Sequence, residues 1–212
     1  MHGKILVVAV ALLAAGCAGA STPGAQGPPS AQTVAQGSSD FSGVQRCGQS
    51  GSYDKYLRAE QTKAPDRYTA DKKTWDDLKS AGANDSYIAA YADTASDCDQ
   101  FASTTLQGKV AEVFAVRFKD SSAAESTYTT SQTQFHLTDS DVAQLKAFGA
   151  TVLEGEPSGL GKNSTVVRFD IAGSTAYIAL WQNKEFEVAL VTYNLPLTAG
   201  PPAVSKINSR VR

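Results

Sequence analysis

The stretch that decides the fold of this chain is Thr165–Asn194, TVVRFDIAGSTAYIALWQNKEFEVALVTYN. It contains three runs rich in β-branched and aromatic residues, near residues 165–172, 175–182 and 185–194. The pairs Gly173-Ser174 and Asn183-Lys184 separate these runs, and two-residue turns of this kind join antiparallel strands. The stretch therefore predicts a three-stranded antiparallel meander.

The turns also determine which side chains share a face of this sheet, because neighbours along a strand point to opposite sides. We expect a core face, covered by helices, made of Val167, Phe169, Ile171, Ile178, Leu180, Ala189 and Val191. The opposite, mixed face is made of Val166, Arg168, Asp170, Tyr177, Ala179, Trp181, Phe186, Val188 and Leu190. The mixed face is too apolar to be left bare.

Four residues of the mixed face form a candidate ligand face: Arg168, Asp170, Tyr177 and Trp181. Here aromatic area adjoins a pair of opposite charges, a combination that binding surfaces often use. The alternative is that helices around Trp75 and Tyr87 cover this face as part of the core. The two interpretations differ in whether Trp181 is exposed.

The rest of the chain predicts helices and one more strand. Period-two apolar residues after Lys109 indicate the strand, and capping residues, apolar spacing and Gly149 indicate helices near 53–61, 70–81, 121–128 and 138–148. A further helical turn is expected around Tyr87, Ile88 and Tyr91, and a short final helix from Pro201. The predicted fold class is α+β, with an antiparallel sheet of about four strands packed with several short helices.

The N-terminus has the pattern of an export signal. Lys4 precedes an apolar segment, residues 5–15, which is too short to span a bilayer as a helix. The following run, Leu12-Leu13-Ala14-Ala15-Gly16-Cys17, resembles the lipobox of bacterial lipoproteins, except that Ala14 stands where a branched residue is usual. The resemblance implies cleavage before Cys17, a lipid on its sulfur, and attachment to a membrane on the extracytoplasmic side of a bacterial cell envelope.

These features divide the chain into three parts. Residues 1–16 are the expected signal peptide, residues 17–40 a lipid-anchored flexible tether, and residues 41–212 a single α+β domain. The tether is expected because residues 21–40 are rich in Pro, Gly, Ser, Gln and Ala, which offer little to bury.

The cysteine content agrees with export. Without Cys17, two of the three cysteines remain, Cys47 and Cys98, and an even remainder in an exported chain predicts a disulfide. Closing that loop would stabilise the domain by about 4 kcal/mol in the chain-entropy model. The alternative is a pair of unlinked buried thiols. Two isolated cysteines lack the paired spacing of zinc sites.

Residues with a clear chemical role are scarce. The net charge is −2, acids and bases are mixed, and no basic patch indicates nucleic acid. No motif indicates a cofactor or a metal. His136 is the single histidine that remains after cleavage, and no nucleophile-elbow serine accompanies it. We therefore expect a non-catalytic domain that binds a small molecule or an envelope protein. The alternative is a small extracytoplasmic hydrolase that uses His136.

Overall fold

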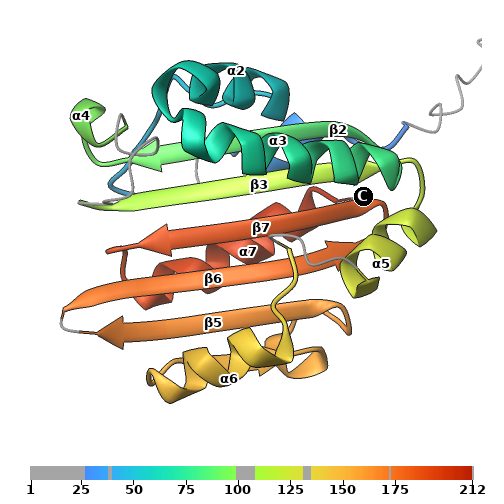
Figure 1. Cartoon of the computed structure of the whole chain (residues 1–212). Coiled ribbons are helices and arrows are strands. Elements are labelled where there is room, and N and C mark those ends of the chain that lie inside the picture. Colours follow the sequence, from blue (N-terminus) through green and yellow to red (C-terminus); the bar gives the residue numbers. More distant parts are fainter. Residues whose placement is uncertain (1–26, 38–39, 99–107, 131–134, 172, 212) are drawn as a thin grey trace, which may run out of the picture.

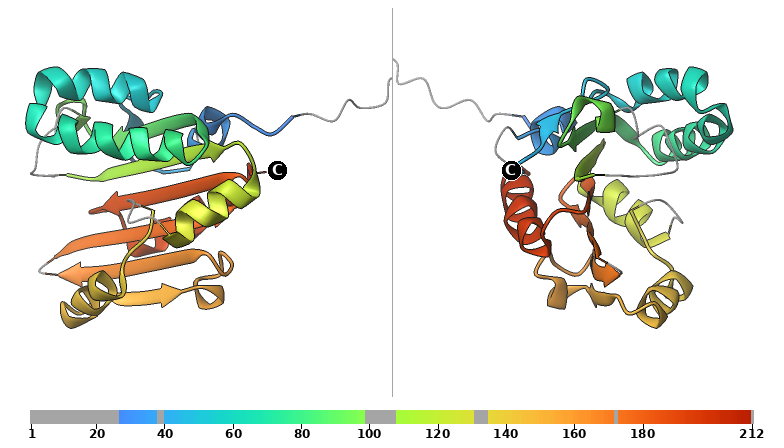
Figure 2. Two further views of the ribbon diagram at one scale, coloured as in Figure 1. Left: turned by 45° about the vertical axis from the view of Figure 1, so that its right-hand side comes forward. Right: turned by 90° about the vertical axis from the view of Figure 1, so that its left-hand side faces the viewer.

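The computed structural model of the chain describes residues 27–37, 40–98, 108–130, 135–171 and 173–211. They form an α+β domain built on one seven-stranded antiparallel sheet, with helices on both of its faces (Figure 1, Figure 2). The predicted fold class is confirmed, although the sheet has seven strands rather than about four. In the described ranges, no helix is long and apolar enough to cross a membrane.

The strand order across the sheet is β1-β2-β3-β7-β6-β5-β4. The predicted meander is β5–β7 and the strand predicted after Lys109 is β3, whereas β1, β2 and β4 were not predicted. The strands are β1 (Gln45–Arg46), β2 (Ala83–Ala92), β3 (Val110–Phe118), β4 (Thr151–Glu154), β5 (Ser164–Ile171), β6 (Ser174–Asn183) and β7 (Phe186–Tyr193).

Both turns of the meander lie one residue from their predicted positions. Ile171 pairs with Ser174, so the first turn is one residue earlier, and Asn183 pairs with Phe186, so the second is one residue later. Each displacement shifts the pairing by two residues, which leaves every side chain on its predicted face. The two faces of the meander are therefore confirmed, while the individual cross-strand pairs differ.

The segment expected to form a helical turn around Tyr87 is strand β2, so that prediction is wrong. β2 pairs with β3 from Ala83 to Ala92. Its second half is buried on both faces, so the period-two alternation that marks a half-exposed strand is absent. Ala89 belongs to the cluster on one face and Ile88 to the cluster on the other.

Four helices cover the face of the sheet that was expected to be the core. Ser52 caps the first of them by accepting a hydrogen bond from the Lys55 amide, and Thr138 and Asp141 form a capping box at the last. These helices are α2 (Tyr53–Lys63), α3 (Pro65–Ser80), α5 (Ser121–Thr130) and α6 (Asp139–Ala147); a short helix, α4 (Ala95–Cys98), and two 3-10 turns, η2 (Glu156–Ser158) and η3 (Leu197–Ala199), complete the connections.

Two helices from opposite ends of the chain cover the other face: α1 (Ala31–Ala35) and α7 (Gly200–Ser209). Ser30 caps α1, whose Ala31, Val34 and Ala35 are fully buried. The segment from Gly27 to Gly37, which the sequence places in a flexible tether, is therefore part of the folded domain. Cys17 lies outside the described residues.

Arg210 joins α1 to α7. Its guanidinium donates to the Val34 carbonyl from Nε at 2.9 Å and Nη2 at 2.8 Å. It also makes a bidentate pair with Asp40, at 2.8 and 2.7 Å. A five-residue helix is not stable alone in water, so α1 depends on this packing and these hydrogen bonds.

The disulfide Cys47–Cys98 is present, as predicted. It links the residue that follows β1 to the end of α4, across 51 positions of sequence. Cys47 is fully buried in a small cluster with Ala90, Ala92 and Val110. The bridge therefore holds the β1 edge of the sheet against the segment that follows β2.

Candidate functional site

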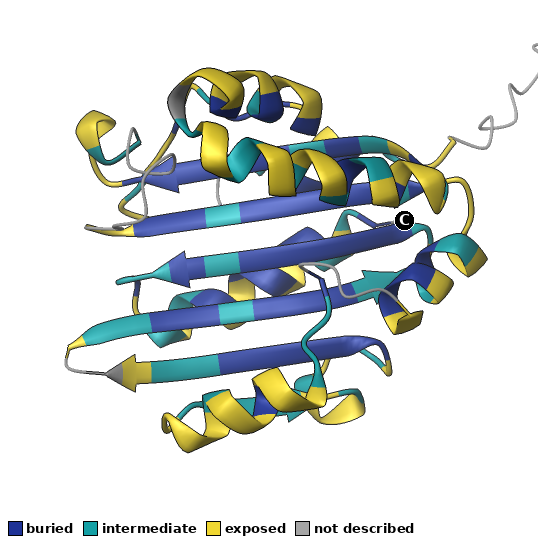
Figure 3. Ribbon diagram, viewed as in Figure 1, coloured by how far each residue is buried: buried dark blue, intermediate teal, exposed yellow. Residues whose placement is uncertain are grey.

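The predicted ligand face is not open. Trp181 is 0% exposed and Tyr177 is 2% exposed, because α7 packs against the face of β6 that carries them. Buried residues dominate the middle of the sheet (Figure 3). Trp181 Nε1 donates to Asn208 Oδ1 of α7 at 3.1 Å, and a Cβ added at Gly200 would lie 2.4 Å from the Tyr177 ring. The interpretation of this surface as a binding face is therefore wrong. Helices do cover it, but they are α1 and α7 rather than helices around Trp75 and Tyr87.

The charged members of that face play different parts. Arg168 is partly buried, with its guanidinium 5.5 Å from the centre of the Tyr177 ring, a cation–π contact. Burial raises the pKa of Tyr177, and Arg168 opposes that shift. Asp170 is exposed near the end of β5. The four residues share a face, as predicted, but they do not enclose a common site.

His136 is not assembled into a catalytic triad by the residues that the structure describes. Its Nδ1 is buried without a hydrogen-bond partner, and its ring meets the Tyr128 ring at 5.5 Å in an edge-on contact. A catalytic base needs an orienting acid and a nucleophile within hydrogen-bond reach. This geometry gives no support to the hydrolase alternative.

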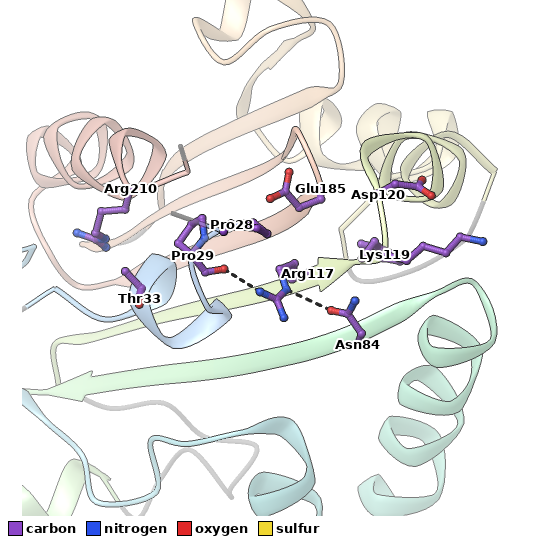
Figure 4. Close-up of a pocket in the computed structure, with 11 residues that line it drawn as sticks. Pro28, Pro29, Thr33, Asn84, Arg117, Lys119, Asp120, Glu185 and Arg210 are labelled. Atoms are coloured by element: carbon purple, nitrogen blue, oxygen red, sulfur yellow. Dashed lines mark hydrogen bonds between the residues drawn. The ribbon is translucent and has the colours of Figure 1, made fainter. Parts of the chain in front are cut away.

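A groove of about 950 Å³ lies at one end of the sheet. Its walls are the segment that leads into α1 and the ends of β2 and β3, together with the β6–β7 turn and the start of α5 (Figure 4). We call it the N-terminal groove; its lining residues include Pro29, Asn84, Arg117, Lys119 and Glu185. Its volume is in the range of small-molecule sites.

Arg117 lies at the centre of the N-terminal groove and is held on two sides (Figure 4). Its Nη1 donates to the Pro29 carbonyl and its Nε to Asn84 Oδ1, each at 3.2 Å, while Nη2 is 4.0 Å from Asp85 Oδ2. A quarter of its side chain stays exposed. A guanidinium has five N–H donors, so Arg117 keeps free donors in a fixed position.

The other charges of the N-terminal groove differ in how far they are compensated. Asp120 Oδ1 accepts a hydrogen bond from the Ala123 amide at 2.7 Å and so caps α5. Lys119 and Glu185 have side chains with no hydrogen bond or ion pair to any described residue. One cation and one carboxylate therefore remain available beside Arg117.

A second cavity, of about 150 Å³, lies beneath α2 and α3 on the opposite face of the sheet. The Tyr53 ring stacks on Phe114 at 4.8 Å and on Tyr56 at 5.5 Å. We call this cavity the acidic pocket; it is lined by Tyr53, Tyr56, Arg67, Asp71, Ile88, Glu112 and Phe114.

Arg67 is the cation of the acidic pocket. Its Nη2 is 2.9 Å from Glu60 Oε1 and 3.9 Å from Asp71 Oδ2, and donates to the Tyr56 hydroxyl at 2.5 Å. Glu112 has no hydrogen bond or ion pair with any described residue. Burial raises the pKa of Glu112 to about 7 and also raises the pKa of Glu60. Glu60 and Asp71 thus approach one guanidinium, and Glu112 lines the same pocket.

Sequence reasoning missed the acidic pocket, although β3 carried a signal for it. Glu112 has the same parity as Val110, Phe114 and Val116, so it lies at an inward position of a strand whose period-two pattern was recognised. Glu60 and Asp71 come from two other elements, and only the tertiary fold brings them near Glu112.

Glu187 is a second inward carboxyl, on β7. It is fully buried and neither of its oxygens has a hydrogen-bond partner among the described residues. Burial alone raises its pKa from 4.5 to about 8. The hydroxyl of Tyr128 is also buried without a partner, and burial raises the pKa of Tyr128 to about 12. Glu187 is therefore largely protonated at neutral pH.

The described residues contain no group of three His, Cys, Asp or Glu side chains arranged to hold a metal ion. Comparison with known proteins adds no family to this description: no protein-family model, no curated protein and no solved structure matches the chain.

Proposed function

We propose that this protein is a lipid-anchored lipoprotein of the bacterial cell envelope whose extracytoplasmic domain binds a small polar ligand in the N-terminal groove without catalysing a reaction. The observation that carries the proposal is Arg117, a guanidinium with free donors fixed at the centre of a cavity of about 950 Å³. Sites of this size with a few fixed polar groups are typical of small-molecule binding.

The proposed location is supported by two features of the chain. Leu12–Cys17 resembles a lipobox, and the Cys47–Cys98 disulfide suits an oxidising compartment. The chain between Cys17 and Gly27 can reach at most about 35 Å when fully extended. Because Gly27 lines the groove, a lipid on Cys17 would keep the groove within that distance of the membrane surface.

The charges of the groove define the class of ligand. Arg117 and Lys119 offer donors and positive charge to an anionic group such as a carboxylate or a phosphate. Glu185, which has no partner among the described residues, accepts a hydrogen bond from a hydroxyl or an ammonium group. The ligand is thus a polar molecule with both an anionic group and a donor.

We expect the variant Lys119→Glu to lose at least about tenfold in affinity for such a ligand, since it reverses a charge at the rim of the groove. Lys119 is exposed, so the fold should change little. The measurement is native mass spectrometry of the small molecules retained by the chain from Ala18 onward, purified from an envelope extract. The matched control is Lys146→Glu on α6, at the far end of the sheet. Equal retention by both variants would show that the groove is not the site.

Cys17→Ser is expected to abolish lipid attachment, because the acceptor is a thiol and a hydroxyl is a much weaker nucleophile. The full-length variant should leave the detergent-rich phase in a phase-partition assay and lack the mass of the lipid. Partition of a correctly processed variant into the detergent-rich phase would exclude the proposed anchor.

A further inference from the structure

We propose that the acidic pocket is a second binding site, which takes a primary alkylammonium ion with its charged end beside Glu112 and its alkyl chain across β7 and β6. This site lies on the opposite face of the sheet from the N-terminal groove and does not depend on the function proposed for that groove.

The charges of the pocket call for an additional cation. Arg67 is shared between Glu60 and Asp71, at 2.9 and 3.9 Å. Glu112 faces the same cavity from β3 without a hydrogen bond or ion pair to any described residue. A carboxylate placed in a pocket is costly unless a counter-ion or a hydrogen-bond donor accompanies it. An ammonium group supplies both, with three N–H donors.

The walls favour an organic cation. Tyr53 and Phe114 line the pocket but are only 2% and 4% exposed, whereas Tyr56 is partly exposed and offers an aromatic ring, to which alkylammonium ions are attracted. The volume of about 150 Å³ is well below that of drug-sized sites, so it holds only the charged end of a ligand.

The register of the sheet shows where the remainder of the ligand would lie. Glu112 pairs with Val191, and Val191 pairs with Ile178, so the three side chains form a row on one face. All three are partly exposed. Adjacent strands are about 4.8 Å apart, so the row runs about 10 Å from the carboxylate. An alkyl chain laid on Val191 and Ile178 would bury apolar surface that is otherwise in contact with water.

The test uses hexylammonium chloride as the probe, with the chain from Ala18 onward, which retains every described residue. Isothermal titration at pH 8 should show saturable binding to the unaltered chain. Hexanol at the same concentration should bind at least about tenfold more weakly, because it lacks the charge, and potassium chloride at equal ionic strength should give no saturable signal. Affinity should fall about tenfold at pH 6, because a carboxyl with a pKa of about 7 is then mostly protonated.

Glu112→Gln preserves the shape of the side chain and removes its charge, so it should weaken hexylammonium binding at least about tenfold. Glu154→Gln, an exposed carboxylate of β4, is the matched control and should bind as the unaltered chain does. Ile178→Ala should weaken the binding of hexylammonium more than that of methylammonium. Lys119→Glu should leave both unchanged, which separates this site from the N-terminal groove.

Three results would overturn the proposal: no saturable binding at pH 8, equal affinity for hexanol and hexylammonium, or equal affinity of Glu112→Gln and the unaltered chain. Should Glu112→Gln fail to fold, Asp71→Asn serves in its place. Asp71 lines the same cavity at the surface of α3, and its amide should weaken hexylammonium binding several-fold.

Discussion

Trp181→Ala is expected to lower the free energy of unfolding by about 3 to 5 kcal/mol, the range for truncating a large buried aromatic residue. Trp181 is fully buried between the sheet and α7. The variant removes this packing and also the hydrogen bond to Asn208 Oδ1. Urea denaturation monitored by far-ultraviolet circular dichroism measures the loss as a lower midpoint with an unchanged slope.

Ile178→Ala is the matched control, from the other face of the same strand. Because Ile178 is only partly buried, its truncation should cost about 1 to 2 kcal/mol. The order of the two losses is the informative result. A loss for Ile178→Ala equal to or above that for Trp181→Ala would mean that α7 does not cover Tyr177 and Trp181 as described.

Replacing Glu187 with Met should stabilise the protein above neutral pH. The folded-state pKa of about 8 exceeds the usual 4.5, so the folded state binds a proton more tightly than the unfolded state does. The contribution of Glu187 to stability is therefore fully present below pH 4.5 and is lost as the pH rises to about 8. The loss reaches at most about 5 kcal/mol, at about 1.4 kcal/mol for each unit of pKa.

The measurement is the free energy of unfolding of Glu187→Met and of the unaltered chain at pH 5 and pH 8.5. The stability of Glu187→Met relative to the unaltered chain should rise by several kcal/mol from pH 5 to pH 8.5. Met is unbranched and of similar length, and it has no group that loses a proton over this range. The difference between the two proteins is the relevant quantity, since burial also raises the pKa of Glu60 and of Glu112. Glu156→Gln, at an exposed carboxylate, should show no such growth. A constant difference would mean that Glu187 is charged in the folded protein.

The C-terminal meander was predictable because the face of each side chain depends only on the parity of its position. Both turns were misplaced by one residue, yet the resulting shift of two left the faces of β5, β6 and β7 unchanged. The individual cross-strand pairs were not predicted correctly, because they depend on the exact position of each turn. Lys184, with a positive φ of 50°, occupies a turn position that its residue type does not mark.

Strand β2 and helix α1 could not be predicted from their own residues. The first half of β2 carries Asn84 and Asp85, which are rare in strands, and its second half is buried on both faces, so alternation does not mark it. Helix α1 is five residues long and lies in a segment whose composition is typical of a linker. Both elements exist because of partners elsewhere in the chain: β3 for β2, and the sheet and Arg210 for α1.

The candidate sites, too, were predictable where the parity of a strand position decides and not predictable where packing between distant segments decides. The meander placed Tyr177 and Trp181 on one face correctly, but whether that face is open depended on α7, whose docking position no local pattern reveals. The inward carboxyls Glu112 and Glu187 were visible as exceptions to the parity of β3 and β7. The N-terminal groove was not visible, because the segment that forms its wall was assigned to the tether.

The clamp between Arg210 and Val34 spans 176 positions of sequence. Contacts between such distant positions require the closure of a very long loop, and they form after the local ones. In a chain that is synthesised from its N-terminus, the hydrogen bonds from Arg210 to α1 therefore form only after the end of α7 has emerged, whereas the packing of α1 on β2 and β3 can form earlier. Removal of Arg210 by proteolysis would then weaken the attachment of α1, a helix formed by residues near the other end of the described chain.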